Sequence, residues 1–233
     1  MFQQHLALMM SNNIIKNQID AYRRNFLKHE SSPLGTYQND LVTMRERHKQ
    51  VLEPLLRVRP EGFSICDVGS GVCDLHKYLK DLGVEHSYTG IEIVPEMVSR
   101  ARELHTTARV LNLDFLDNSF NECFDFVVLS GTFNLPGQTP ADQWEQFIFD
   151  MITQMYDRAK IGIAFNALTT YTSFRSDQLF YLEPERAMSF IQSRLSRFCA
   201  LSSAYPLFEV TYTVFKPEGV RELFPDLEFR KYF

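Results

Sequence analysis

ICDVGSGVCD, residues 65–74, is the stretch of sequence that decides the fold. It completes a short apolar run and then places two glycines, Gly69 and Gly71, just before a predicted helix. A glycine has no side chain, so the backbone can turn sharply there and approach a ligand closely. The N-terminus of the following helix adds free N–H donors. The stretch therefore predicts a strand, a tight turn and a helix, with a ligand site at the turn.

Strand and helix patterns alternate after this turn. Apolar runs predict strands over residues 63–68, 88–93, 109–113, 124–129 and 161–165. Helical patterns occupy residues 75–82, the segment that begins at Pro95, and residues 143–156 and 184–195. Two last strand patterns, 198–203 and 207–216, have no helix between them. The fold class is therefore α/β, a doubly wound sheet that is mostly parallel and ends in an antiparallel C-terminal edge hairpin.

Two helical patterns, over residues 12–28 and 40–56, precede the first strand. The segment SSPLG separates them, and Pro60 and Gly62 end the second. The second pattern has one apolar side that includes His48 as well as leucine, methionine and valine residues. We expect residues 1–59 to form an N-terminal helical lid and residues 60–233 to form the sheet domain, in a single compact unit.

The composition is typical of a cytoplasmic globular protein. Of 233 residues, 45% are hydrophobic, which allows a large core, and the formal net charge of -5 argues against a nucleic-acid partner. No apolar run approaches the roughly 20 residues that span a bilayer, and the N-terminus lacks the features of a signal peptide. The four cysteines form no C-x-x-C pair, so we expect reduced thiols and no metal site.

Two acids near the glycine turn bear on the kind of ligand. Glu92 stands 25 positions after Asp67, at the end of the second predicted strand, where a carboxylate can accept both ribose hydroxyls of an adenosine. Asp74 occupies the position of the last glycine in G-x-G-x-x-G. A carboxylate at a helix start repels a pyrophosphate but suits a ligand with an ammonium group. Charge therefore favours S-adenosylmethionine over NAD.

The block around the turn resembles the first motif of the class I, Rossmann-like S-adenosylmethionine-dependent methyltransferases, acid-x-Gly-x-Gly-x-Gly. Cys73 replaces the third glycine, and we expect it to reduce the clearance near the cofactor. Glu92 in YTGIEIVPEMV is similar to the second motif, and Asp114 in LNLDFL is similar to the acid that contacts adenine, although Asp114 could simply cap the turn before Phe115. Residues 124–129, followed by SGTFN, are similar to the fourth-strand motif. The resemblance covers residues 60–215.

This resemblance implies the fold and the methyl donor, together with a set of cofactor contacts at the ends of four strands. The expected cofactor-binding residues are Asp67, Gly69, Ser70, Gly71, Glu92, Ile93, Asp114, Phe115 and Ser130, with Arg47 from the lid. Arg47 or Arg45 could hold the carboxylate of the cofactor's methionine end, because a guanidinium group matches a carboxylate with two parallel hydrogen bonds. The alternative for either arginine is a position on an exposed helix face.

The acceptor is expected beyond the carboxyl ends of the fourth and fifth strands, beneath the lid. The expected substrate-binding residues are Thr132, Phe133, Asn134, Asn166, Tyr171 and Tyr37. Their polar and aromatic side chains suit a small polar molecule. No histidine follows the fourth strand, so we assign no catalytic base; among the histidines only His48 lies in a segment expected to cover the pocket, and His76 is expected on a solvated helix face.

The leading hypothesis is methyl transfer to an O or N atom of a small metabolite, by a monomer or homodimer without a nucleic-acid or membrane partner. The absence of an N-P-P-Tyr tetrad after the fourth strand argues against the methyltransferases of DNA bases and glutamine. A protein or RNA methyltransferase is a second hypothesis in the same class. A catalytically silent, cofactor-binding regulatory protein is a third, and a nicotinamide enzyme is the remaining alternative.

Overall fold

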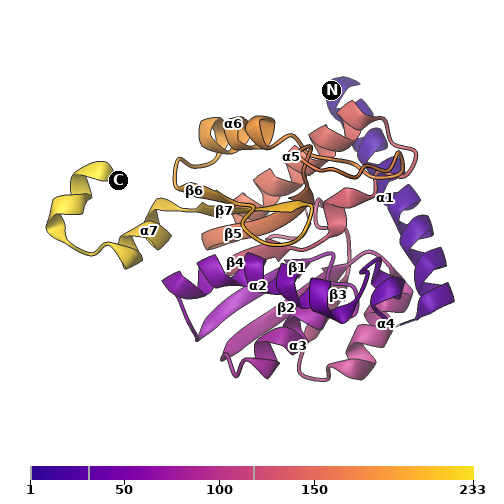
Figure 1. The fold of residues 1–233 in the computed structure, drawn as a ribbon, viewed down its shortest axis with the longest axis horizontal. Helices are drawn as coiled ribbons and strands as arrows, with labels where there is room; N and C mark the ends of the chain where they lie inside the picture. The colour runs from indigo at the N-terminus through magenta and orange to yellow at the C-terminus, as the bar shows by residue number, and fades with distance from the viewer. Residues whose placement is uncertain (1, 31, 118) are drawn as a thin grey trace.

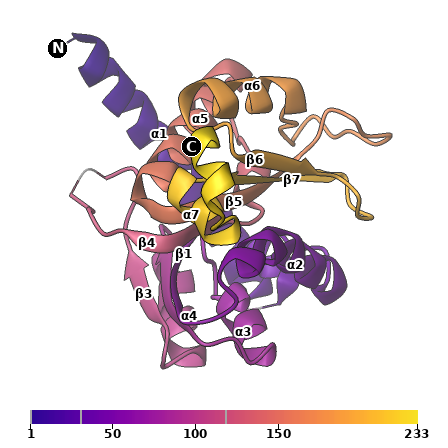
Figure 2. The ribbon, with the colours of Figure 1, turned by 90° about the vertical axis from the view of Figure 1, so that its left-hand side faces the viewer.

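A seven-stranded sheet with helices on both faces forms the centre of the computed structural model, which describes residues 2–30, 32–117 and 119–233 (Figures 1 and 2). The strands are β1 (Phe63–Val68), β2 (His86–Glu92), β3 (Arg109–Asn112), β4 (Phe124–Leu129), β5 (Ala159–Leu168), β6 (Cys199–Ser202) and β7 (Glu209–Phe215). Their order is β3-β2-β1-β4-β5-β7-β6. The pairs from β3 to β5 are parallel, and β7 runs antiparallel to both β5 and β6. This topology confirms the predicted fold class.

The helices divide between the two faces of the sheet. They are α1 (Phe2–His29), α2 (Leu41–Val58), α3 (Asp74–Asp81), α4 (Pro95–Leu104), α5 (Ala141–Arg158), α6 (Pro184–Arg194) and α7 (Pro217–Leu223), with short 3-10 helices η1 (Pro33–Thr36), η2 (Thr132–Asn134) and η3 (Leu227–Tyr232). Apolar side chains of α5 and α6 pack in one core cluster, and those of α2, α3 and α4 pack in another on the opposite face.

The continuous apolar run 126–129 within β4 has a direct explanation in this layered arrangement. Phe126 and Val128 belong to the core on the α2 face, whereas Val127 and Leu129 belong to the core on the α5 face. Successive side chains of a strand point to opposite faces, so the part of a strand that is covered on both sides is apolar at successive positions. The same reasoning places β4 in the middle of the sheet, between β1 and β5.

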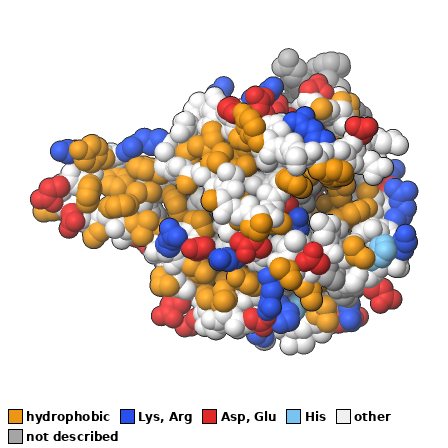
Figure 3. Space-filling model, viewed as in Figure 1, with side chains coloured by type: hydrophobic (Ala, Val, Ile, Leu, Met, Phe, Trp, Pro, Cys, Tyr) orange, Lys and Arg blue, Asp and Glu red, His pale blue; other side chains and the backbone are white. Residues whose placement is uncertain are grey.

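The predicted limits of β1 and β4 match the structure, whereas α1 begins at Phe2 and not at residue 12. Two further regions also differ from prediction. β5 continues to Leu168, beyond its predicted end at residue 165, because β7 pairs with it as far as Glu209. After β7 the chain adds α7 and η3, which project from the domain (Figure 1). Figure 3 shows hydrophobic side chains gathered on the surface of this arm. The exposed large apolar residues there are Leu223, Phe224, Leu227, Phe229 and Tyr232.

The N-terminal segment lies against the sheet domain. Helix α2 carries Met44, Val51 and Leu55 on its buried side, as its apolar periodicity predicts. An ion pair also joins α2 to β7, with Arg47 Nε 2.6 Å from Glu209 Oε1 and both side chains almost fully buried. No helix in the described part of the chain is long and apolar enough to span a membrane.

The buried ion pair makes a stability prediction. Glu209→Ala leaves the Arg47 guanidinium buried without its counter-charge, and we expect the free energy of unfolding to fall by about 3 kcal/mol in urea titrations. The matched control is Glu53→Ala, which removes the exposed partner of Arg57 and should change stability little. Similar small losses in both variants would contradict a stabilising role for the buried pair.

Candidate active site

The turn after β1 lies at the point where the strand order reverses, between β1 and β4. Gly69 and Gly71 have φ angles of 70° and 56°, in the left-handed region that favours glycine. A Cβ atom on Gly69 would collide with Thr132 Oγ1, and one on Gly71 would lie 3.2 Å from Thr36 Cγ2. The turn therefore lies close to η2 at Gly69 and close to η1 at Gly71. Such a reversal point is where open α/β sheets bind ligands.

Cys73, in place of the third glycine, also has a positive φ angle of 66°. Its side chain is fully buried, and its Sγ atom would lie 3.1 Å from a Cβ atom on Gly90. Gly90 thus leaves space for the thiol inside the domain. Cys73 is not among the residues that line the cleft, so the expectation that it narrows the cofactor site is not supported.

Glu92 is the last residue of β2, and its carboxylate binds the backbone of the turn after β1 and of the start of α4. Its Oε2 accepts a hydrogen bond from the N–H of Gly71, and its Oε1 accepts one from the N–H of Val94, each at 2.9 Å. Burial raises the pKa of Glu92, and these backbone donors act in the opposite direction. Each carboxylate oxygen can accept more than one hydrogen bond, so Glu92 can hold the turn and still receive hydroxyl groups.

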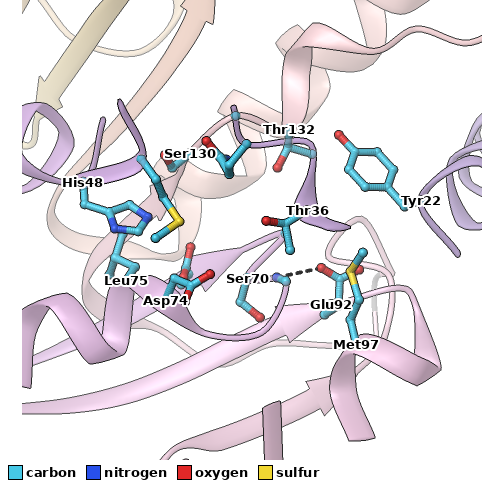
Figure 4. Close-up of a pocket in the computed structure, with 16 residues that line it drawn as sticks. Tyr22, Thr36, His48, Ser70, Asp74, Leu75, Glu92, Met97, Ser130 and Thr132 are labelled. Atoms are coloured by element: carbon cyan, nitrogen blue, oxygen red, sulfur yellow. Dashed lines mark hydrogen bonds between the residues drawn. The ribbon is translucent and has the colours of Figure 1, made fainter. Parts of the chain in front are cut away.

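Two adjoining pockets form one cleft over the turn. Tyr22, Gly69, Glu92 and Thr132 line both pockets and so mark the boundary between them. Figure 4 shows Tyr22 and Met97 at one end of the first pocket and His48 at the other.

The first pocket is polar and acidic. Its described lining includes Asp67, Asp74 and Glu92 but no lysine or arginine. Burial raises the pKa of Asp67 to about 7, and the charges of Glu92 and Asp74 add to the rise, whereas a hydrogen bond from Tyr88 Oη at 2.7 Å acts against it. Burial also raises the pKa of Asp74. The pocket therefore favours a ligand with positive charge.

The cleft contains buried polar atoms with no partner in the described chain. They are His48 Nδ1 and Ser130 Oγ in the first pocket and Gln18 Oε1 in the second. Burial lowers the pKa of His48 to about 3, with the positive charge of Arg47 acting in the same direction, so its imidazole is neutral at neutral pH. Because an unpaired buried polar group is costly, these atoms fit a site that receives a polar ligand.

The second pocket has a mostly apolar lining. Ile93, Leu113, Phe115 and Phe147 line it, with Asp114 among them. Asp114 Oδ1 accepts a hydrogen bond from the N–H of Leu116 at 2.9 Å. The structure thus shows the turn-capping role for this acid and also places it at the pocket, so the two roles are compatible. A flat apolar ring system with a polar edge fits this pocket.

Nine of the ten expected cofactor residues line the cleft. Asp67, Gly69, Ser70, Gly71, Glu92, Ile93, Asp114, Phe115 and Ser130 all do so. Arg47 is the exception, because its Nε donates to Glu209 and its Nη1 donates to Gln38 Oε1. Glu209 in turn accepts a hydrogen bond from Asn166 Nδ2 at 2.6 Å. The guanidinium group of Arg47 therefore binds protein side chains and does not line the cofactor cleft.

Of the expected substrate residues, only Thr132 lines this cleft. Phe133 packs in the core against Phe165, and Asn134 Oδ1 accepts from the N–H of Leu168, which fixes the loop to β5. Asn166 is held between Glu209 and the N–H of Gly131. Their polar or aromatic character serves the fold at these positions.

The two expected tyrosines lie elsewhere. Tyr171 is 71% exposed and donates to Glu185 on α6, beside a separate hollow between α6 and the β6–β7 hairpin. Tyr37 contacts Tyr22 edge to face, with ring centroids 5.0 Å apart, and does not itself line the cleft. Tyr37 thus packs behind Tyr22, which lines the pocket.

Several lining residues come from the lid and were not assigned to the site from sequence: Gln18, Thr36, Gln38, Met44 and His48. The position of His48 on the apolar side of its helix was the available signal, since a histidine there must be buried. His76, expected on a solvated face, is only 5% exposed, because its ring packs on Tyr88 and its Nδ1 lies 2.9 Å from His86 Nε2.

Comparisons with known proteins agree with this geometry. A family model described as "Methyltransferase domain" matches residues 65–153. A Mycobacterium tuberculosis protein with the name "Putative methyltransferase Rv1506c" is 34% identical over 157 residues, which is 66% of this chain and 93% of that protein.

Solved structures share the fold at low sequence identity. The N-methyltransferase NodS of Bradyrhizobium japonicum WM9, in complex with S-adenosylhomocysteine, has 15% identity and a TM-score of 0.60 over 86% of this chain and 99% of its own. DhpI with the same ligand has 16% identity and a TM-score of 0.59 over 88% and 97%.

The chain therefore belongs to the methyltransferase family. More particularly, it belongs to the class I, Rossmann-like S-adenosylmethionine-dependent methyltransferases, in agreement with its motifs and sheet order.

Asp67 makes a pH-dependent stability prediction. The pKa of Asp67 is about 7 in the folded protein, against 3.8 for an ordinary aspartate. Between pH 4 and pH 7 the folded chain therefore holds a proton on Asp67 that the unfolded chain has released. The contribution of Asp67 to the free energy of unfolding falls as the pH rises through this range. Asp67→Asn should therefore gain stability over the wild type from pH 4 to pH 8, by up to about 4 kcal/mol in urea unfolding. Asp81→Asn, at an exposed acid, should show no such gain. A constant difference between wild type and Asp67→Asn would contradict the raised pKa.

Proposed function

We propose that this chain binds S-adenosylmethionine in the cleft and transfers its methyl group to an O or N atom of a small polar metabolite. The observation that carries the proposal is the Glu92 carboxylate, buried at the boundary of the two pockets and fixed by the N–H groups of Gly71 and Val94. An acid at this point can accept the ribose hydroxyls. The adenine would then lie in the apolar second pocket and the methionine end in the acidic first pocket.

The charge of the first pocket supports the methyl donor. S-adenosylmethionine supplies an electrophilic methyl group on a sulfonium and also carries an ammonium group. Asp67, Asp74 and Glu92 surround the space that these groups would occupy, without a competing lysine or arginine among the described lining residues. A pyrophosphate would meet the same acids with unfavourable charge, so the lining disfavours a nicotinamide cofactor.

Positioning is the contribution that these residues can make to methyl transfer. Thr132 and Ser130 stand at the end of β4, and Thr36 and Gln38 reach the cleft from the lid, so hydroxyl and amide groups surround the first pocket on two sides. Held in this way, an acceptor can approach the methyl group in line, which accounts for much of the rate in such reactions. No residue is assigned as a base, since an acceptor that loses its proton easily needs none.

The polar lining also supports the class of acceptor. Tyr22, Thr36, Gln38, Ser130 and Thr132 offer hydrogen bonds to a compact neutral or cationic molecule. Small-molecule substrates are named for solved relatives of the fold, such as the magnesium protoporphyrin IX methyltransferase of Synechocystis. An RNA acceptor is less well supported, because the chain has a net charge of -5.

Cofactor binding can be tested at Glu92. Glu92→Gln loses one acceptor and brings an amide NH₂ against the N–H of Gly71 or Val94, so we expect the Kd for S-adenosylhomocysteine to rise about tenfold or more in calorimetric titrations. Glu103→Gln, at an exposed position of the same region, is the matched control and should bind as the wild type does. Unchanged affinity in Glu92→Gln, with the fold intact by circular dichroism, would refute this placement of the ribose.

The acceptor class can be tested by turnover. Small amines, phenols and alcohols are incubated with protein and S-adenosylmethionine, and release of S-adenosylhomocysteine is measured. We expect turnover on a subset of these compounds. Turnover only on peptides or RNA would favour the second hypothesis, and tight cofactor binding without turnover on any acceptor would favour a regulatory protein.

A further inference from the structure

One end of the first pocket brings an imidazole and a carboxylate together. His48 extends from α2, and Asp74 opens α3; Figure 4 shows both at the same end of the pocket, opposite Tyr22 and Met97. His48 is only 5% exposed, and its Nδ1 has no hydrogen-bond partner in the described part of the chain. The ring is also held in place by Tyr78, with ring centroids 5.8 Å apart. A rigid, buried and unpaired polar atom in a pocket points to a ligand group that pairs with it.

The charge balance of the lining narrows the kind of group. Asp67, Asp74 and Glu92 cannot donate hydrogen bonds when ionised, and no lysine or arginine is among the described lining residues. His48, whose imidazole is neutral at neutral pH, can present an N–H donor there without adding a negative charge. An anionic group on the ligand would therefore be directed to His48, away from the three acids.

We propose that His48 Nδ1 donates a hydrogen bond to the carboxylate of the cofactor's methionine end, while Asp74 accepts one from its ammonium group. The inference rests on the proposed binding of S-adenosylmethionine in this cleft. The two ligand groups are attached to the same carbon atom, so they require an acid and a donor close together. His48 and Asp74 are such a pair at one end of the pocket.

The neighbouring arginine is not available for this task. Arg47 precedes His48 in α2, but its guanidinium group is bound to Glu209 and Gln38. The neutral imidazole can donate in the tautomer that carries its hydrogen on Nδ1, and a bound carboxylate would further favour a proton on the ring. The histidine thus takes the role that a guanidinium group would otherwise have.

The test compares two ligands that differ in the carboxylate. S-adenosylhomocysteine carries both the carboxylate and the ammonium group, whereas decarboxylated S-adenosylmethionine lacks the carboxylate and keeps the ammonium group and a sulfonium. Each variant is therefore compared with the wild type for the same ligand, so that the sulfonium does not enter the comparison. For His48→Ala, we expect the Kd for S-adenosylhomocysteine to rise about tenfold to a hundredfold and the Kd for the decarboxylated ligand to stay within about twofold. Asp74→Asn should weaken both ligands.

Two further variants serve as controls. His48→Asn places an amide NH₂ near the position of Nδ1 and should recover most of the affinity for S-adenosylhomocysteine. His105→Ala removes a histidine outside the cleft and should bind both ligands as the wild type does. Thermal unfolding of each variant verifies that the fold is retained.

Several results would overturn the inference. Equal losses for both ligands in His48→Ala would show a general packing role. Unchanged affinity for S-adenosylhomocysteine together with loss of turnover would assign His48 to the acceptor, as a base. If the wild-type protein bound neither ligand, the proposed function itself would fail, which is a different result from either of these.

Discussion

The buried carboxylate of Glu92 holds the two backbone segments that form the floor of the cleft. It accepts hydrogen bonds from the turn after β1, at Gly71, and from the start of α4, at Val94. A carboxylate buried without such donors would cost several kcal/mol, so the two segments can adopt this arrangement only together with the acid. The group that is proposed to face the ribose therefore also determines where the loops around the ribose lie.

A second buried network sets the opposite wall. Arg47 joins Gln38 of the lid to Glu209 on β7, and Asn166 on β5 joins Glu209 to the backbone of Gly131 after β4. Both ends of this network, Gln38 and Gly131, line the first pocket. The lid and the loop after β4 are thus connected through this network, and they also lie close together, since a Cβ atom on Gly131 would be 3.1 Å from Gln38 Nε2.

The sequence predicted the sheet and its ligand-binding edge because both depend on local patterns. Strand ends that meet at one edge bring Gly69, Glu92 and Asp114 together whatever the details of packing. The lid could not be predicted so closely, since neighbouring residues of a helix point about 100° apart and only the docking of α2 decides between Arg47 and His48. The start of the loop after β5 could not be predicted either, because the length of the β5–β7 pairing determines where the strand ends.

The acidity of the first pocket bears on the whole catalytic cycle in the proposed binding mode. The donor carries a sulfonium that the product S-adenosylhomocysteine lacks, so the donor has one more positive charge. In a pocket that contains Asp67, Asp74 and Glu92, this difference in charge favours the donor over the product. Because the pKa of Asp67 is about 7, this acid is partly protonated at neutral pH and adds less negative charge to the empty pocket. A bound cation would favour its ionised form. The same acids that select the methyl donor would thus weaken the hold on the product once the methyl group has left.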